Sequence, residues 1–422
     1  MQTFSLRYIF FILFFIFYST LLSAQESTKL NIKELQQLGL QANGLVQAAR
    51  SQVDMAEAGV VAASAYPNPN VSIKVGPQSK RLPVSVTGPA DNYREVNVSQ
   101  PIENPFFRSA RINSAEALVD ARQANLDQVR ADLAAQLRVR AYELILRQEQ
   151  AQMESNIYDL MKEIQRRIQV SVEVGETARF ELIRADTEVL SAENRMEAAK
   201  LNAERARVAL IQLAAGALQS GFEIDASLND PVEFPSLEAL RQEIIETNPD
   251  IQRLQAEQKS ADSRIDQEKA SVLPRVNILY ENYHDAQFST NVAGVNLEIP
   301  LFYRRRGEID TAIYDSARLR DTLEYRRFEI GQLLESAWQA KEIARRRVEM
   351  FEGGIVTEAQ LALSIAQTAY RLGERGFIEV LDTQRVLRGV LGDLLQARFE
   401  LQSAAAEIDR LRAHYPKEHI IE

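Results

Sequence analysis

The chain has 422 residues, of which 45% are hydrophobic and 26% are charged, a composition that is ordinary for a folded protein. Its net charge of −10 argues against nucleic acid as a partner. Because the sequence contains no cysteine, we expect neither a disulfide framework nor a lipid anchor attached through an N-terminal cysteine.

The first 24 residues have the pattern of a secretory signal peptide, which we place at 1–24. Arg7 is their only charged side chain, and an apolar run over 8–18 is followed by small residues near Ala24. The alternative is a retained single-span anchor, for which the apolar run is short. No later run is long and apolar enough for a transmembrane helix, so we expect any membrane crossing to use strands.

The remainder consists of two copies of one unit. Equivalent residues are 205 positions apart before the strands and 198 or 199 apart after them, as shown by Leu35 and Leu240, Asn43 and Asn248, Pro69 and Pro274, Pro101 and Pro300, and Gly175 and Gly373. Offsets that hold over long stretches indicate a duplication. We therefore expect one repeat over 25–220, a linker over 221–235, a second repeat over 236–412 and a tail over 413–422.

Each repeat is expected to contain an opening helix, a strand pair, a long helix, a glycine turn and a return helix. The expected helices span 31–64, 109–172 and 178–215 in the first repeat, and 236–270, 308–371 and 376–412 in the second. The first long helix has no Gly or Pro and would extend about 96 Å. In the second, Gly331 and the pair Gly353-Gly354 are the expected kinks. We expect the return helix of the first repeat to stack on the opening helix of the second, with the joint over 216–235.

Four short segments alternate apolar and polar residues. The apolar positions are Val71, Ile73 and Val75; Val96 and Val98; Val276, Ile278 and Tyr280; and Val295, Leu297 and Ile299. This alternation is typical of a membrane barrel with a wet lumen. Single-chain barrels begin at about eight strands, and an open sheet in lipid leaves unpaired edges. We therefore expect several copies to share one barrel. Three copies of four strands give 12, although two or four copies are not excluded.

Aromatic and basic residues follow the second and fourth strands, which we expect to end at Pro101 and Pro300. A girdle at the membrane interface would place aromatic rings at headgroup level with cations behind them. The alternative is an ordinary hydrophobic staple beside solvated charges. Because the pattern occurs in both repeats, we favour the girdle, formed by Phe106, Phe107, Arg108, Phe302, Tyr303 and Arg304.

The duplicated order of elements resembles the TolC-like outer-membrane efflux proteins over essentially the whole mature chain. The segment from Ala65 to Asn70 also resembles the CzcC-like heavy-metal branch of that family. The resemblance implies a mainly α fold with a small β part. Duplicated long helical hairpins would form a trimeric coiled-coil tunnel in the periplasm, and the strands would contribute to a shared 12-stranded transmembrane β-barrel in the outer membrane.

The most specific part of the resemblance is the turn of the second hairpin. In TolC-like proteins this turn faces the periplasm, where a Tyr and an Arg form polar links that hold the tunnel shut and acidic residues ring its narrowest point. The matching positions are Tyr370, Arg375, Glu379 and Asp382, with Glu181 of the first hairpin as the acidic partner of the Arg. TolC itself has Asp at the positions of Glu181 and Glu379, so we expect the diameter of the acidic ring and the geometry of the link to differ from those of TolC.

Spacing supports an acidic ring independently. Glu379 and Asp382 are three positions apart and share a helix face, so a trimer would gather six carboxylates around one axis and attract cations. A solvated acidic face is the alternative. The two turns also resemble the sites where the periplasmic adaptor docks, and the residues concerned are Gly175, Glu176, Leu372, Gly373 and Glu374.

The sequence contains no recognisable catalytic motif and no energy-coupling motif, so we expect neither an enzyme nor a cofactor. Its histidines are His284, His414 and His419, and we expect no dedicated metal site. A metal site formed by His414 and His419 is the alternative to a solvated tail.

The leading hypothesis is a passive outer-membrane duct. Implied partners are two further copies of the chain, a periplasmic adaptor, an inner-membrane pump of the RND type and outer-membrane lipid. Small substrates, drugs or metal cations, would pass through it. The alternatives are a duct for type I protein secretion, an exported coiled-coil scaffold without a pore, and, least favoured, a secreted enzyme.

Overall fold

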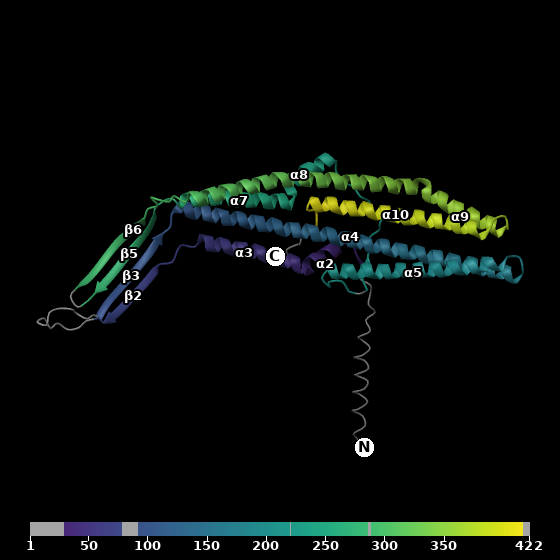
Figure 1. Cartoon of the computed structure of the whole chain (residues 1–422), viewed down its shortest axis with the longest axis horizontal. Coiled ribbons are helices and arrows are strands. Elements are labelled where there is room, and N and C mark those ends of the chain that lie inside the picture. The colour runs from purple at the N-terminus through teal and green to yellow at the C-terminus, as the bar shows by residue number, and fades with distance from the viewer. Residues whose placement is uncertain (1–28, 78–91, 220, 286–287, 417–422) are drawn as a thin grey trace, which may run out of the picture.

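The computed structural model describes residues 29–77, 92–219, 221–285 and 288–416. The expected signal peptide and the end of the tail, with His419, lie outside the described residues. The chain is elongated, with a small sheet at one end and the turns of two helical hairpins at the other (Figure 1). No helix among the described residues is long and apolar enough to cross a membrane.

The described helices form a layer of four columns that run along the long axis (Figure 1). The helices are α2 (Ile32–Ala42), α3 (Gly44–Ser64), α4 (Pro105–Glu173), α5 (Arg179–Leu213), α6 (Leu237–Thr247), α7 (Pro249–Ala270), α8 (Arg306–Met350), the π-helical η1 (Phe351–Ile355), α9 (Val356–Arg371) and α10 (Phe377–Leu411). Column 1 holds α3 and α5, column 2 is α4, column 3 holds α7 and α10, and column 4 holds α8, η1 and α9. The short α2 and α6 lie near the middle of the layer, which we call the waist.

The opening helices are each broken in two, contrary to the expectation of single helices. The break falls at Asn43 in the first repeat and at Asn248 in the second, so each asparagine ends one helix and begins the next. The Asn43 side chain accepts a hydrogen bond from the N–H of Leu45 at 2.9 Å. Asn248 accepts from the N–H groups of Asp250 and Ile251 at 3.1 and 3.3 Å. Asparagine offers the backbone such a cap as an alternative to a continuous helix.

The same asparagines join helices within one repeat, so the expected stacking across repeats is wrong. Asn43 Nδ2 donates to the carbonyl of Leu213, the last residue of α5, at 3.2 Å. Asn248 Nδ2 donates to the carbonyl of Leu411, the last residue of α10, at 2.9 Å. Each return helix therefore abuts its own repeat's opening helix, because the strand pair sends the chain back beside the helix that preceded it. The C-terminus of one helix dipole meets the N-terminus of the next.

Column 2 is continuous, whereas column 4 is kinked. Helix α4 has 69 residues without a break, and seven of its 18 buried side chains are alanines, which permit close approach of its neighbours. In column 4 the helix passes Gly331 undisturbed but opens into a π-helical turn at Gly353-Gly354, where Gly354 has non-helical torsion angles. The expected kink at the glycine pair is confirmed, and the one at Gly331 is not present.

At the waist, equivalent residues of the two repeats form two separate parts of the core. Leu35 and Leu240 are both fully buried, as are Leu210 and its counterpart Ile408. The first pair packs in separate clusters, each with its own opening, long and return helices. The duplication seen in the sequence is thus a duplication of packing.

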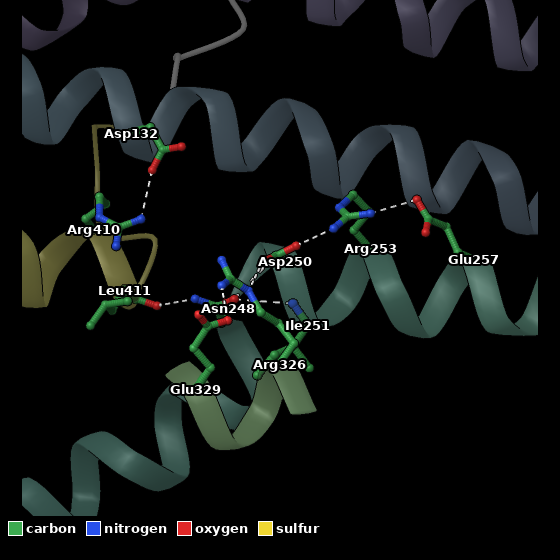
Figure 2. Close-up of polar contacts among 10 residues, drawn as sticks. All are labelled: Asp132, Asn248, Asp250, Ile251, Arg253, Glu257, Arg326, Glu329, Arg410 and Leu411. Carbon is green, nitrogen blue, oxygen red and sulfur yellow. Dashed lines mark hydrogen bonds and ion pairs between the residues drawn. The ribbon is translucent and has the colours of Figure 1, made fainter. Parts of the chain in front are cut away.

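A polar network ties columns 2, 3 and 4 together at the waist of the second repeat (Figure 2). The buried carboxylate of Asp250 receives hydrogen bonds from Arg253, at 2.5 Å, and from Arg326 of α8. Burial raises the pKa of Asp250, but the hydrogen bonds and positive charges of the two arginines outweigh it and leave that pKa below its ordinary value. Arg410 of α10 reaches Asp132 of α4 at 3.0 Å.

The four long strands form one antiparallel sheet in the order β2 (Asn70–Pro77), β3 (Asn92–Ile102), β5 (Arg275–His284), β6 (Ser289–Glu298). Val71 lies opposite Val98, Val98 opposite Tyr280, and Ile278 opposite Val295, so the expected apolar residues within the strands share one face. Ile299, also expected in the fourth strand, lies just beyond the end of β6. Pro101 does not end its strand, since it pairs with Asn277 and β3 continues to Ile102. The outer edges of β2 and β6 have no strand beside them in the described chain.

One small sheet was not anticipated. Strand β1 (Lys29–Leu30) pairs in parallel with β4 (Glu223–Ile224), which lies in the expected linker. This pairing anchors the start of the described chain to the waist, where Leu30 and Phe222 join the first repeat's core.

We predict that Asn248→Ala lowers stability by about 1–2 kcal/mol, because it removes a helix cap and leaves a carbonyl of α10 without its donor. Asn43→Ala should cost less, since Asn43 accepts one N–H rather than two and its donated bond is longer. The measurement is the loss of helical circular dichroism on heating in detergent. The exposed Asn194→Ala serves as control. Equal melting of all three variants would contradict the proposed joint.

Candidate functional site: the hairpin tips

The two hairpin tips have the same backbone turn. Gly175 and Gly373 adopt left-handed torsion angles, with φ of 80° and 74°. In each turn the N–H after the glycine reaches back to a carbonyl five residues earlier: Glu176 to Ser171, and Glu374 to Ala369, both at 2.9 Å. This pattern is a Schellman motif, which favours glycine because a side chain is strained at positive φ. The sequence-based prediction of glycine turns is confirmed.

The residues expected to dock an adaptor are all exposed at these tips. Gly175, Glu176, Leu372, Gly373 and Glu374 are exposed to solvent. Leu372 leaves 69% of its surface uncovered, and Val174, its equivalent in the first tip, leaves 64% uncovered. Each tip thus presents an apolar residue, a glycine and a carboxylate in the same order, and this combination offers a protein partner both hydrophobic contact and charge.

Among the expected gate residues, Tyr370 and Glu181 are brought together from different hairpins. Tyr370 packs against Phe377 with 6.1 Å between ring centroids. Burial of the Tyr370 hydroxyl, and then the nearby charge of Glu181, raise the pKa of this tyrosine. Glu181 Oε2 is buried and has no hydrogen-bond partner in the described chain. A buried carboxylate oxygen without a donor is costly, so Glu181 is poised to accept a hydrogen bond.

Arg375 lies elsewhere in the single chain. Its Nη1 is 3.2 Å from Glu379 Oε1, one helical turn away, and the side chains are 64% and 42% exposed. The family resemblance assigns Arg375 to Glu181, but within one chain it pairs with Glu379. Asp382 is 65% exposed and 3.6 Å from Arg385. Glu379 and Asp382 therefore both face solvent near the second tip, as the acidic-ring hypothesis requires.

Three charged residues in the tip half of the hairpins were not predicted from the sequence. Arg385 of α10 pairs with Glu188 of α5 at 2.5 Å and so links the hairpins directly. Glu188 lies seven positions after Glu181, on the same helix face, and this spacing was the available signal. Glu154 of α4 lies between two arginines farther from the tip. Nothing in its local sequence distinguishes it from other helical glutamates.

At the sheet end, the aromatic and basic clusters divide into two groups. Phe106 and Tyr303 are 73% and 58% exposed, and Phe302 is fully exposed. Arg108, in contrast, donates to the carbonyl of Ser64 at 2.7 Å and stacks over Tyr66, 4.4 Å from the ring centroid. The aromatic rings are thus free to meet an apolar environment, while Arg108 holds the strand-to-helix junction. Phe107 is half-buried and Arg304 is exposed.

The described residues contain no group of three or more His, Cys, Asp or Glu side chains that could hold a metal ion. His414 lies beside Tyr415, whose hydroxyl donates to Asp127 at 2.8 Å. His419 lies outside the described residues, so the alternative of a metal site in the tail stays a hypothesis.

The model of the family "Outer membrane efflux protein" matches residues 35–216 and 240–414, which is most of the chain and falls once on each repeat. The chain belongs to the outer membrane efflux protein family. The resemblance on which the sequence analysis rested is therefore confirmed, and with it the expectation of an efflux protein rather than an enzyme.

Two curated relatives in this efflux family are named for metal resistance. The chain is 26% identical over 375 residues to the cobalt-zinc-cadmium resistance protein CzcC of Cupriavidus metallidurans, covering 87% of this chain and 86% of that one. It is 27% identical over 322 residues to the nickel-cobalt-cadmium resistance protein NccC of Alcaligenes xylosoxydans xylosoxydans, covering 75% of this chain and 71% of the relative.

The fold matches that of solved channels of this kind. The structure of CusC superposes with a TM-score of 0.78 at 16% sequence identity, covering 92% of this chain and 93% of that one. At this identity the likeness establishes the fold. The expected fold class, mainly α with long hairpins and four strands, is confirmed, and in the single chain the sheet is open.

Proposed function

We propose that three copies of this chain close into one outer-membrane duct that passively conducts small substrates from the periplasm to the exterior. The observation that supports this proposal most directly is that the sheet and the helical layer both end in unpaired edges on the same two sides of the molecule. Strands β2 and β6 have unpaired outer edges, and columns 1 and 4 expose apolar side chains. An open edge in lipid or water is a liability that pairing with another copy removes.

The exposed apolar side chains of columns 1 and 4 favour a closed ring of several copies of the chain. Column 1 exposes Leu45, Met55, Val61, Ile183, Leu190, Leu201 and Val208, and column 4 exposes Ile313, Tyr314, Tyr325, Phe328, Ile343, Leu361 and Ile365. In column 3, by contrast, α7 exposes no large hydrophobic side chain and α10 exposes only Ile378 and Val386. Column 4 of one copy would pack on column 1 of the next, a head-to-tail contact that closes when the rotation permits. Three copies give 12 strands and 12 columns.

The sheet supports a membrane location and argues against the scaffold hypothesis. Its apolar face carries Ile73, Val98 and Ile278, whereas the opposite face carries Lys74 and Glu95, which form an ion pair at 2.9 Å. A soluble scaffold would have no use for an unpacked apolar sheet face, while a shared barrel would turn that face to lipid and the polar face to the lumen. The exposed Phe106, Phe302 and Tyr303 would then lie at the lipid interface.

The partners follow from the tips. A periplasmic adaptor would dock on the exposed Gly175–Glu176 and Leu372–Glu374, and an inner-membrane pump of the RND type would supply the drive. Because both curated relatives are named for resistance to divalent metals, we favour metal cations over drugs or secreted proteins as substrates. The duct would be closed at the tips by Tyr370, Arg375 and Glu181, with Glu379 and Asp382 around its narrowest point.

The function is tested by reconstituting the purified protein in planar bilayers and by fractionating cells. We expect discrete conductance steps and a heat-modifiable trimer from the outer membrane. Recovery only as a soluble periplasmic protein, without conductance, would overturn the proposal in favour of a scaffold. Deletion of the gene should raise sensitivity to divalent metals, and an altered set of secreted proteins instead would favour protein secretion.

We predict that Leu201→Asp, on column 1, weakens the trimer, because it would bury an unpaired carboxylate between copies. Val386→Asp, on α10 in column 3, is the matched control, since Val386 is also largely exposed in the single chain, at 60% against 70% for Leu201. Trimer content is measured by size-exclusion chromatography in detergent. Equal loss of trimer in both variants would contradict the assigned interface.

We predict that Arg375→Ser loosens the closed tip and raises single-channel conductance, because it removes the only cation of the expected polar link. Arg167→Ser is the control, since Arg167 makes an exposed ion pair with Glu163 inside α4. A conductance equal to that of the unmodified channel would place the gate elsewhere.

We predict that the double variant Glu379→Gln and Asp382→Asn weakens block of the channel by multivalent cations, because a trimer would lose six carboxylates at one level. The control removes two exposed carboxylates from α5 by Glu193→Gln and Glu197→Gln. Block is measured as the cation concentration that halves the current. An unchanged value in the tip variant would show that the constriction lies at other residues.

A further inference from the structure

A carboxylate between the hairpins is caught between two arginines and fully paired with neither. Glu154 belongs to α4, and its side chain is 13% exposed. Its Oε2 is 3.5 Å from Nε of Arg195 on α5, and its Oε1 is 4.0 Å from Nη1 of Arg388 on α10. Both Glu154 Oε2 and Arg195 Nε are buried without a hydrogen-bond partner. Both separations are longer than the roughly 2.7–2.9 Å of a charge-assisted hydrogen bond, so the buried carboxylate of Glu154 is not fully stabilised by either arginine.

The two arginines belong to different hairpins. Arg195 lies on the return helix of the first hairpin, which also contains Glu154, whereas Arg388 lies on the second. A movement of α10 by about 1 Å toward α4 would give Glu154 a close pair with Arg388. A movement away would leave Glu154 to Arg195 alone. The position of the second hairpin therefore decides which arginine Glu154 pairs with.

The structure contains room for that movement. A cavity of about 450 Å³ lies between α4 and α10 at this level, with walls that include Ile157, Leu387 and Leu391. Arg388 and Gln384 also line it, and Gln384 is 5% exposed with its Nε2 unpaired. The apolar walls of this cavity are not packed against each other, and the buried amide of Gln384 without a partner adds a further cost. Closing the gap would improve both.

A hinge lies beside the cavity. The π-helical turn at Gly353-Gly354 interrupts column 4, whereas α4 is continuous at every level. Arg398 lines the cavity and pairs with Glu352 of the π-helical turn at 2.8 Å. Column 4 can thus bend at this point, since glycine pairs and π-bulges are where helices bend, whereas α10 passes the same level without a break.

We propose that Glu154 is a gate-positioning residue: its exchange between Arg195 and Arg388 sets how tightly the tip half of the second hairpin is held to the first. This inference rests on the proposed duct function. Pairing with Arg388 holds the hairpins together and keeps the tip closed, and pairing with Arg195 releases the second hairpin.

The test uses two variants that should act in opposite directions. Arg388→Gln leaves Glu154 with Arg195, so the ratio of open to closed dwell times should rise about fivefold or more, the lower end of typical coupling between sites. Arg195→Gln leaves Glu154 with Arg388, so the same ratio should fall. Arg167→Gln, within α4, is the matched control. A merely structural role for these arginines would change the ratio in the same direction in both variants.

A second readout reports the cavity itself. Because the protein has no cysteine, Leu391→Cys introduces a unique thiol in the cavity wall. Its rate of reaction with a small methanethiosulfonate should fall in the Arg195→Gln background and rise with Arg388→Gln. Trimer content from outer membranes verifies assembly of each variant. If the unmodified protein conducts but both arginine variants match the control, the gate-positioning role is wrong. If the unmodified protein forms no pore, the duct function itself fails.

Discussion

The unbroken helix α4 sets the length that every other column must match. Its 69 residues extend roughly 100 Å, and no break relieves that span. Columns 1 and 3 reach the same length with two shorter helices placed end to end. Their joints leave the last carbonyls of one helix facing the first N–H groups of another, and Asn43 and Asn248 satisfy both. The waist exists because these two joints fall at the same level.

The repeats share this construction but differ in how their waists are fastened. The position equivalent to Asp250 is Leu45 in the first repeat, where it is 71% exposed. Asp250 instead is buried between two arginines and binds column 3 to column 4 (Figure 2). In the proposed trimer, the first repeat would therefore offer an apolar edge to a neighbouring copy, while the second uses the same position for contacts inside the chain. The two repeats have thus diverged: equivalent helices form column 1 at the edge of the layer and column 3 in its interior.

The difference continues toward the tips. The first hairpin has a continuous long helix, and the second has a glycine pair and a π-helical turn at the same level. Near the kink, the contacts between the hairpins are loose, with a cavity and several buried atoms without partners. Closer to the tip, Ile164, Val380 and Leu381 form a tight apolar cluster. The tip of the second hairpin is therefore packed tightly against the first hairpin, whereas the packing between the two hairpins is looser near the kink.

Much of this was available from the sequence, because it depends on local patterns. The offset between repeats fixed the duplication, the alternation at Val71, Ile73 and Val75 fixed a strand, and Gly373 fixed a turn that only glycine adopts without strain. The exposed acidic pair at the second tip also follows from spacing along one helix. Such features depend on residues within a few positions of one another, so they are legible without the fold.

Only the tertiary structure decided which elements meet. Asn43 looks like any polar residue in a helical pattern until the carbonyl of Leu213, 170 positions away, is placed beside it. Likewise, the chain brings Glu181 to Tyr370 and leaves Arg375 with Glu379, although Arg375 was expected to pair with Glu181, and Glu379 to lie in the acidic ring. The sequence by itself determined two helical hairpins and four strands. Only the packing of the columns against one another placed the joints, the buried charges and the partners of Glu154. These contacts join residues that are far apart along the chain, so no repeating sequence pattern predicts them.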